Sequence, residues 1–292
     1  MTTDMYTILA KQNLNQNVKR LDIRAEGLVG KIKPGQFVAV MPDAFSRRVP
    51  FSVFEVDWRR KCFSIVFEEN DAETLKMGAM KINDELFAVS GPFGAPLVLE
   101  KKGTVACVGE GLGLVTLVAL CRSLKQIGNK VIGIAGFETR KSSILENQMR
   151  LNCNKFYVMY GDGMHERKGD VLMSFKRLLD DAMVDEVYVD ATATITRDIC
   201  RVAADKGVRV FINLLPLVGS RPAFFEATHI MLKGKRHYPA VDGTIVDAGK
   251  VDWKEFESAI LSAKEYSECR RKESALWHRP SVFARFRKFI WG

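Results

Sequence analysis

The chain has 292 residues, of which 47% are hydrophobic and 27% charged, so it is long enough for two globular domains of ordinary composition. No apolar run reaches the length of a membrane span, and the amino terminus lacks the pattern of a signal peptide, which favours a cytoplasmic location. The formal net charge is +9, but residues 269–292 hold seven Lys or Arg and one Glu, so most of the excess is a local basic tail.

Residues 1–100 have the pattern of a small all-β domain. Six short segments predict strands, and turn residues separate most of them. The predicted strands are 6–10, 18–23, 36–40, 50–56, 62–67 and 85–89. Six short strands at close spacing indicate a six-stranded antiparallel barrel. Gly91-Pro92-Phe93-Gly94 follows the last strand and marks the domain boundary.

Residues 101–215 alternate between predicted strands and predicted helices. The strands are 105–108, 131–135, 155–160, 186–189 and 208–212, and the helices are 114–127, 144–151, 171–179 and 196–206. This alternation predicts a doubly wound parallel sheet with ligands at the carboxyl ends of its strands. Residues 216–250 are short and irregular, and 251–292 contain a helix from Asp252 to about Cys269 followed by a basic amphipathic tail.

The six cysteines are scattered and form no C-x-x-C pair; they are Cys62, Cys107, Cys121, Cys153, Cys200 and Cys269. Several lie within apolar runs. This pattern is typical of buried free thiols in a reducing compartment, and it favours neither disulfides nor a metal site.

The turn after the first strand of the sheet is the most informative local motif. Gly109-Glu110-Gly111-Leu112-Gly113 joins a buried strand to a helix, and glycines in such a turn let backbone N–H groups approach a diphosphate. Glu110 places a carboxylate where that anion would lie. The motif therefore predicts a nucleotide fold with an altered nucleotide site.

Eight short motifs in a fixed order carry a resemblance to a known family. They are Arg48-Val49-Pro50-Phe51-Ser52, Gly91-Pro92-Phe93-Gly94, Gly109-Glu110-Gly111-Leu112-Gly113, Ser143-Ile144-Leu145-Glu146, Gly161-Asp162-Gly163, Arg167-Lys168-Gly169, Val241-Asp242-Gly243 and Val251-Asp252-Trp253. Over residues 5–255 the chain resembles the flavin-carrying small subunit of NADH-dependent ferredoxin:NADP oxidoreductase and the electron-transfer subunit of dihydroorotate dehydrogenase, in the ferredoxin reductase superfamily. The resemblance implies an FAD-binding barrel at 1–100, an NAD(P)-binding-like domain at 101–215, a remnant of an iron–sulfur loop at 216–250, and a helical tail at 251–292.

The resemblance implies an FAD site on the barrel. Its residues would be Arg48, Val49, Pro50, Phe51, Ser52, Phe67, Glu68 and Thr74. Arg48 would pair with the diphosphate, strand 50–52 and the Ser52 hydroxyl would bond the isoalloxazine edge, and Phe67 and Glu68 would flank the ribityl and adenine side. Thr74 would bond a phosphate oxygen, although Asp71 stands where the family usually has glycine. In the alternative interpretation, Arg47 and Arg48 are surface charges and Phe51 is barrel core.

The same resemblance implies a pyridine-nucleotide site. Its residues would be Gly109, Gly111, Gly113, Thr139, Arg140, Asp162 and Gly163. Glu110 and Val115-Thr116 depart from the family's glycine loop, Glu138 stands where an arginine often meets a 2′-phosphate, and the segment from Asp190 to Ile195 replaces Gly-Pro-x-x-Met-Met. These departures argue against NADP and leave NAD open; the alternative is a sheet kept only for its shape.

The resemblance also includes a 2Fe–2S cluster, which we expect this chain to lack. Such clusters need thiolate ligands, and residues 216–250 contain no cysteine. His229 and His237 cannot supply the usual four ligands. The sequence shows no nucleophile, general base or metal-ligand pattern, so we predict neither catalytic residues nor a metal site.

Two functions follow from these observations. The leading hypothesis is an FAD-containing electron-transfer subunit of a multi-subunit oxidoreductase, passing electrons between a pyridine nucleotide or a partner's redox centre and another subunit. The alternative is a docking subunit that keeps the fold without redox activity. Residues 281–291 are basic and amphipathic, and we expect them to dock on another subunit rather than on a membrane surface. Nucleic-acid binding is not favoured, because no groove-reading motif is present.

Overall fold

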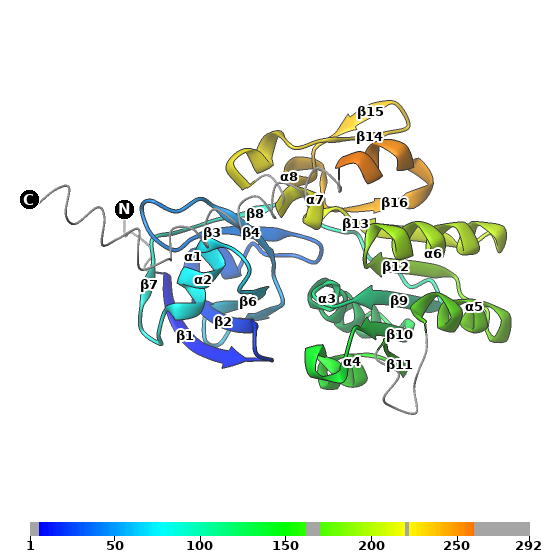
Figure 1. Cartoon of the computed structure of the whole chain (residues 1–292), viewed down its shortest axis with the longest axis horizontal. Coiled ribbons are helices and arrows are strands. Elements are labelled where there is room, and N and C mark those ends of the chain that lie inside the picture. Colours follow the sequence, from blue (N-terminus) through cyan, green and yellow to red (C-terminus); the bar gives the residue numbers. More distant parts are fainter. Residues whose placement is uncertain (1–5, 162–169, 220–221, 260–292) are drawn as a thin grey trace, which may run out of the picture.

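The computed structural model describes residues 6–161, 170–219 and 222–259. They form an all-β unit and an α/β unit that lie side by side, with residues 214–219 and 222–259 lying above them (Figure 1). Within these described ranges no helix is long and apolar enough to cross a membrane.

The all-β unit contains two antiparallel sheets. The larger has the order β5 (Glu55–Asp57), β6 (Cys62–Glu68), β2 (Val18–Arg24), β1 (Tyr6–Asn13) and β7 (Glu85–Leu86). The smaller has the order β4 (Val49–Ser52), β3 (Phe37–Met41) and β8 (Ala88–Phe93). Alternate residues of both sheets bury a shared core that includes Ile8, Leu21, Val40, Phe63 and Ile65, and α1 (Glu26–Val29) and α2 (Ala72–Ala79) lie beside it.

The predicted count of six strands is wrong, although the antiparallel class is right. The segment 50–56 divides into β4 and β5, because the chain leaves the smaller sheet after Ser52 and Phe54 then donates its N–H to Ser64 of the larger sheet. The segment 85–89 divides in the same way into β7 and β8, which pair with different sheets. Alternation of apolar residues does not reveal where a strand changes sheets, because both halves face one core.

The α/β unit has a six-stranded sheet in the order β11 (Lys155–Tyr160), β10 (Lys130–Phe137), β9 (Thr104–Glu110), β12 (Glu186–Asp190), β13 (Arg209–Asn213) and β16 (Ile245–Asp247). The first five strands are parallel, as predicted, and β16 is an antiparallel edge. β16 was not predicted, because three residues in an irregular segment carry no period. The strand order reverses between β9 and β12, which is where ligands bind on sheets of this kind.

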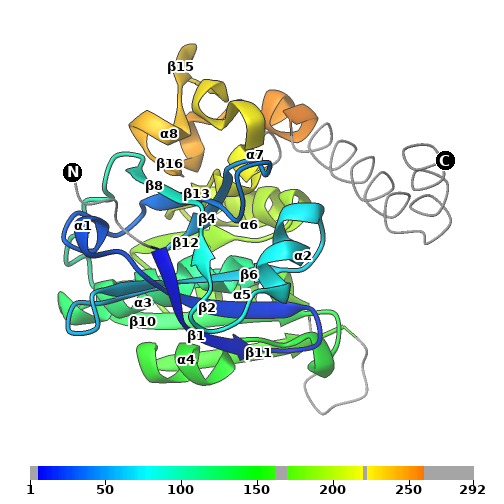
Figure 2. The ribbon, with the colours of Figure 1, turned by 90° about the vertical axis from the view of Figure 1, so that its left-hand side faces the viewer.

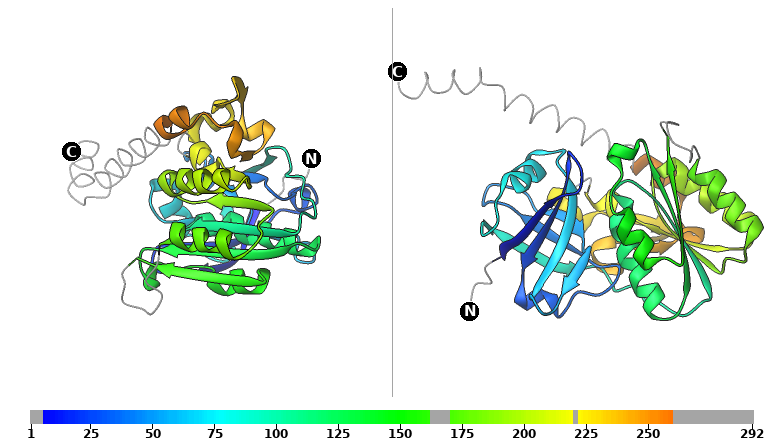
Figure 3. Two further views of the ribbon diagram at one scale, coloured as in Figure 1. Left: turned by 90° about the vertical axis from the view of Figure 1, so that its right-hand side faces the viewer. Right: turned by 90° about the horizontal axis from the view of Figure 1, so that it is seen from below.

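Helices cover both faces of this sheet, as Figure 3 shows from two sides. α3 (Gly113–Gln126) and α4 (Glu146–Asn152) pack with one set of alternating strand residues, and α5 (Val171–Asp181) and α6 (Ala193–Asp205) pack with the other. The α3 side also contacts Val18, Phe54 and Val66 of the all-β unit. The helix α3 therefore lies at the boundary between the two units.

The segment after β13 is a packed cap. It contains α7 (Leu215–Gly219), η2 (Pro222–Ala227), β14 (Ile230–Leu232), β15 (Lys235–His237), α8 (Pro239–Asp242) and η3 (Ala248–Lys250). Figure 2 shows it above β8 and β13. The ring of Phe225 is fully buried, 5.9 Å from the ring of Phe37 and 5.1 Å from that of Phe93. A helix begins after Asp252, as predicted, and its predicted end and the basic tail lie outside the described residues.

Candidate functional site

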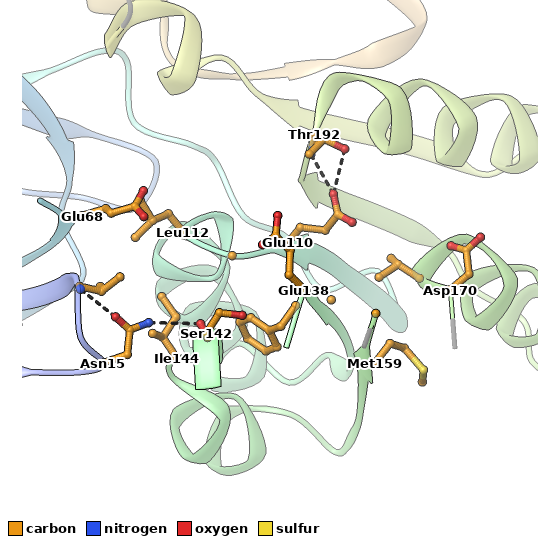
Figure 4. A pocket seen from close by; sticks show the side chains of 16 residues that line it. Asn15, Glu68, Glu110, Leu112, Glu138, Ser142, Ile144, Met159, Asp170 and Thr192 are labelled. Carbon is orange, nitrogen blue, oxygen red and sulfur yellow. Dashed lines mark hydrogen bonds between the residues drawn. The ribbon is translucent and has the colours of Figure 1, made fainter. Parts of the chain in front are cut away.

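The switch point of the sheet is occupied by a carboxylate of the chain itself. Glu110 ends β9, and its Oε2 accepts hydrogen bonds from the backbone N–H of Thr192 at 3.1 Å and from the Thr192 hydroxyl at 2.9 Å (Figure 4). Thr192 is the N-cap residue of α6. A negative charge is thus held at a helix N-terminus, in the position that favours an anion.

The three glycines of the loop, Gly109, Gly111 and Gly113, differ in what a side chain at each position would contact. A Cβ on Gly113 would lie 1.9 Å from the carbonyl oxygen of Asp190, and one on Gly109 would lie 2.4 Å from Leu117. Gly111 has a φ of 51°, and a Cβ there would meet nothing within 4 Å. Gly113 is therefore required for α3 to pack against β12, whether or not a nucleotide binds, and a side chain at Gly109 would force the buried Leu117 side chain to move.

A cavity of about 580 Å³ lies in front of this loop, between the two units. Its charged lining residues, among those that the structure describes, are all acidic: Glu68, Glu110, Glu138 and Asp170. Apolar side chains such as Phe137, Ile144 and Val171 form much of the remaining wall. Asn15 of the all-β unit closes one side by donating a hydrogen bond to the carbonyl of Ser142 at 3.3 Å (Figure 4).

The described part of this lining is unfavourable for a pyridine dinucleotide. Its diphosphate would approach several carboxylates and, among the described lining residues, no Lys, Arg or His. Thr139 accepts a hydrogen bond from the N–H of Ser142 and caps η1 (Arg140–Ser142), while Arg140 is exposed. Neither belongs to the cavity's described lining. Asp162 and Gly163, also predicted for this site, lie outside the described residues.

The predicted flavin strand is β4, on the smaller sheet. Val49, Pro50 and Phe51 are buried, and Ser52 at its end is half-buried. The rings of Phe51 and Phe67 lie 5.8 Å apart in the barrel core. Their side chains are packing residues, so only their backbone atoms are available to a ligand. Glu68 lines the acidic cavity.

Arg48 is the arginine of this strand that fits an anion. Its Nη2 lies 3.0 Å from Oε1 of Glu226, and the two side chains are 44% and 42% exposed. The guanidinium also lies over the ring of Phe225, 5.5 Å from its centre. An exposed ion pair contributes only about 0–1 kcal/mol, so a diphosphate could replace Glu226 at small cost. Arg47 instead makes a two-pronged contact with the buried carboxylate of Glu73.

The start of α2 does not fit a phosphate. Asp71 is the N-cap, and its Oδ1 accepts hydrogen bonds from the N–H of Thr74 at 2.8 Å and from the Thr74 hydroxyl at 2.7 Å. The Thr74 oxygen in turn accepts a hydrogen bond from the N–H of Asp71 at 3.0 Å. The groups expected to bond a phosphate are thus satisfied by a carboxylate of the chain. For FAD, the β4 end of the site fits and the α2 end does not.

A partly buried polar chain crosses the boundary between the two units. The hydroxyls of Ser52 on β4 and Thr116 on α3 lie 2.8 Å apart. The amide of Asn213 donates hydrogen bonds to Thr116 at 3.2 Å and to Oδ2 of Asp190 at 2.7 Å. Burial raises the pKa of Asp190 to about 7, although the hydrogen bond from Asn213 acts in the opposite direction.

Sequence reasoning missed this chain of residues. From the sequence, Asp190 and Thr116 stand out only because each lies in a segment that departs from the family's pattern. The sequence signal for it is a polar residue at the carboxyl end of two strands, Asp190 on β12 and Asn213 on β13. Adjacent parallel strands end at the same edge of a sheet, so two such residues are expected to lie close together.

Comparison with known proteins gives a relative over nearly the whole chain. The dihydroorotate dehydrogenase B (NAD(+)) electron transfer subunit homolog of Thermotoga maritima is 24% identical over 264 residues, which are 90% of this chain and 93% of that protein. The electron transfer subunit of Streptococcus thermophilus is 28% identical over 171 residues, which are 56% and 65% of the two chains. No family model matches the chain.

A solved structure is similar to this chain in fold. A chain of the NADH-dependent reduced ferredoxin-NADP oxidoreductase, described in connection with flavin-based electron bifurcation, superposes with a TM-score of 0.83 at 23% identity. The match covers 94% of this chain and 100% of the other.

The chain is similar in sequence to proteins named dihydroorotate dehydrogenase B electron transfer subunits. It has the ferredoxin reductase-like fold, and the resemblance predicted from its motifs is confirmed. Within residues 6–161, 170–219 and 222–259, no group of three or more His, Cys, Asp or Glu is arranged to hold a metal ion. The expected absence of a 2Fe–2S cluster stays a prediction, based on the lack of cysteine in 216–250.

Proposed function

We propose that this chain is an FAD-containing electron-transfer subunit of a multi-subunit oxidoreductase, and that its flavin exchanges electrons with a redox centre of a partner subunit. The observation that carries this proposal is the environment of Arg48, just before β4: its side chain is exposed and contacts an exposed carboxylate and the Phe225 ring, and Ser52 lies half-buried at the end of the strand. The names of the homologues, which are electron transfer subunits, support it.

The flavin would supply one-electron and two-electron transfer when bound. The chain's own residues would bind and orient it. Arg48 would neutralise part of the diphosphate charge, the backbone of β4 would offer polar groups to the ring, and the Ser52 hydroxyl would bond the ring edge. The acidic cavity supports a partner as the electron donor or acceptor, because its carboxylates oppose a pyridine dinucleotide at this chain's own sheet.

The visible spectrum of the native complex tests the proposal. We expect a yellow protein with absorption near ~450 nm. Arg48→Ala should weaken FAD retention by about tenfold, because one charge-assisted contact to the diphosphate is lost. Arg59→Ala, at an exposed arginine on the turn between β5 and β6, is the matched control and should retain the flavin. A colourless native complex, or equal losses in both variants, would refute the proposal.

A second candidate function, a docking subunit without a redox cofactor, is supported by the contacts of two carboxylates. Asp71 fills the N-terminus of α2 and Glu110 that of α6, so two places suited to phosphates hold carboxylates of the chain. These contacts support a docking subunit that keeps the fold and binds no redox cofactor. The two functions differ in cofactor content: the docking subunit would remain in its complex and carry no flavin after gentle purification and acid extraction.

A further inference from the structure

Two hydroxyl groups meet where the all-β unit touches the α/β unit. The Oγ of Ser52, at the end of β4, lies 2.8 Å from Oγ1 of Thr116 on α3, and either atom can donate in this contact. Thr116 is 9% exposed, whereas Ser52 is half-buried, so part of the serine remains accessible. The direction of this hydrogen bond therefore decides what Ser52 offers to a ligand on its accessible side.

The side-chain amide of Asn213 is fixed by contacts with three other elements. Its Oδ1 accepts a hydrogen bond from the backbone N–H of Leu215 at 3.0 Å. Its Nδ2 donates to Oγ1 of Thr116 at 3.2 Å and to Oδ2 of Asp190 at 2.7 Å. An amide nitrogen carries two protons, so these two contacts use both. The Thr116 oxygen thus accepts a hydrogen bond from Asn213, and its own proton needs another acceptor.

The proton of the Thr116 hydroxyl is directed at Ser52. In the part of the chain that the structure describes, the Ser52 Oγ is the acceptor within hydrogen-bond distance of this hydroxyl. A buried donor without an acceptor is destabilising, and an oxygen that accepts one hydrogen bond becomes a better donor of the next. Thr116 therefore donates and Ser52 accepts. The Ser52 proton is left to point away from Thr116.

We propose that Thr116 and Asn213 are positioning residues, which hold the hydroxyl of Ser52 in place as an outward hydrogen-bond donor. The inference rests on the function proposed above for its ligand: a flavin ring against β4 offers acceptor atoms at its edge, and hydrogen bonds to the ring tune its electronics. Thr116 belongs to the Val115-Thr116 pair in which this chain departs from the family's loop. This departure places a hydroxyl of the α/β unit behind the serine of the barrel.

NMR of protein with carbon-13-labelled serine and threonine tests the positioning without a flavin. In the wild-type chain we expect the proton between the two hydroxyl oxygens to correlate with the Cβ of Thr116 and not with that of Ser52. Thr116→Val removes the hydroxyl and keeps the side-chain shape, so the Ser52 side chain should change from one rotamer to an average of several. Thr116→Ser should restore the single rotamer. Thr196→Val is the matched control and should leave Ser52 unchanged, because Thr196 is 4% exposed and its hydroxyl, on α6, donates to the carbonyl of Ala191.

A shared proton that belongs to Ser52 in the wild-type chain, or a single Ser52 rotamer in Thr116→Val, would overturn the proposal. In the FAD-loaded protein we expect Thr116→Val to shift the visible absorption band and the reduction potential of the flavin, because the donor to the ring is no longer held in place. Thr116→Ser and Thr196→Val should keep the wild-type values. Identical values in Thr116→Val and the wild type would refute the extension to the flavin. A protein that binds no flavin would refute the proposed function, and the NMR measurements would still decide the positioning of Ser52.

Discussion

Two carboxylates at the same edge of the sheet have opposite environments. Glu110 is held by the N–H and hydroxyl of Thr192, which are groups that favour the charged form. Asp190 is buried, and the neutral amide of Asn213 donates a hydrogen bond to it. The distinction depends on which residues the fold brings to each carboxylate. For Asp190, burial raises the pKa to about 7.

Asp190 should make the stability of the chain depend on pH. Its pKa is raised from 3.8 to about 7 in the folded state, so the folded chain binds more protons than the unfolded chain between these values. The free energy of unfolding should therefore fall as pH rises through this window. Relative to Asp190→Asn, the wild type should lose about 3 kcal/mol between about pH 5 and about pH 8. Urea denaturation of both proteins at both pH values measures this, and parallel curves would contradict it.

Removing the charge of Glu110 should improve nucleotide binding. Glu110→Gln keeps an oxygen that can accept from Thr192 and takes one negative charge from the cavity. We expect the affinity for NADH to rise by about tenfold, or about 1.4 kcal/mol, from reduced repulsion. Glu100→Gln, which removes an equal charge from an exposed ion pair with Lys102, is the control. Titration calorimetry with NADH compares the two, and an equal effect of both changes would show that only net charge matters.

At this scale the sequence predicted part of the site. The misfit of Glu110 with a diphosphate followed from its place in the glycine loop, because the loop and the helix after it are adjacent in sequence. The polar chain from Ser52 to Asp190 could not be predicted in the same way. Its members come from β4, α3, β12 and β13, and their contacts exist only after two units have packed together.

At the scale of elements, the N-terminus of α2 is occupied by a carboxylate of the chain, Asp71, where an external anion could otherwise bind. Asp71 and Thr74 satisfy one another's backbone N–H groups at its N-terminus. Asp71→Ala should lower the free energy of unfolding by about 1 kcal/mol, because this cap is lost, while Asp71→Gly should cost only a few tenths. Thermal or urea unfolding measures both changes.

The two Asp71 variants also separate stability from ligand binding. Asp71→Gly removes the carboxylate and leaves backbone N–H groups exposed, so we expect it to retain FAD more tightly than the wild type. Asp205→Ala, at an exposed helix end, serves as the control for a lost negative charge. If Asp71→Gly bound FAD no better than this control, the start of α2 would not belong to the flavin site.

The regular parts of both sheets were predictable because their residues repeat. The buried strands β9, β10 and β12 are continuous apolar runs, and each is followed by a glycine or polar turn. The edge strand β16 and the change of sheet after Ser52 were not predictable. Both are set by contacts between distant segments, such as the pairing of Ile212 with Val246, and not by a local pattern.

At the scale of the whole molecule, most of the net positive charge lies in residues 270–292. Residues 270–292 lie outside the described residues; they hold seven Lys or Arg and one Glu, so their removal lowers the net charge from +9 to +3. We expect this truncation to weaken co-purification with partner subunits, and the loss to resemble the effect of high salt on the full-length chain. Pull-down of the native complex at low and high salt tests this. Equal recovery of the partners with both chains would exclude the tail as a docking segment.

The burial of Phe225 has a consequence for how the chain unfolds. This ring packs against the rings of Phe37 and Phe93, which also contact each other, so the smaller sheet of the all-β unit is covered by a side chain that follows it by more than a hundred positions in sequence. A fragment that ends at the first domain boundary would leave those two rings in water. The two units should therefore melt together in a single calorimetric transition, and a protease that cuts between them should not release an intact barrel.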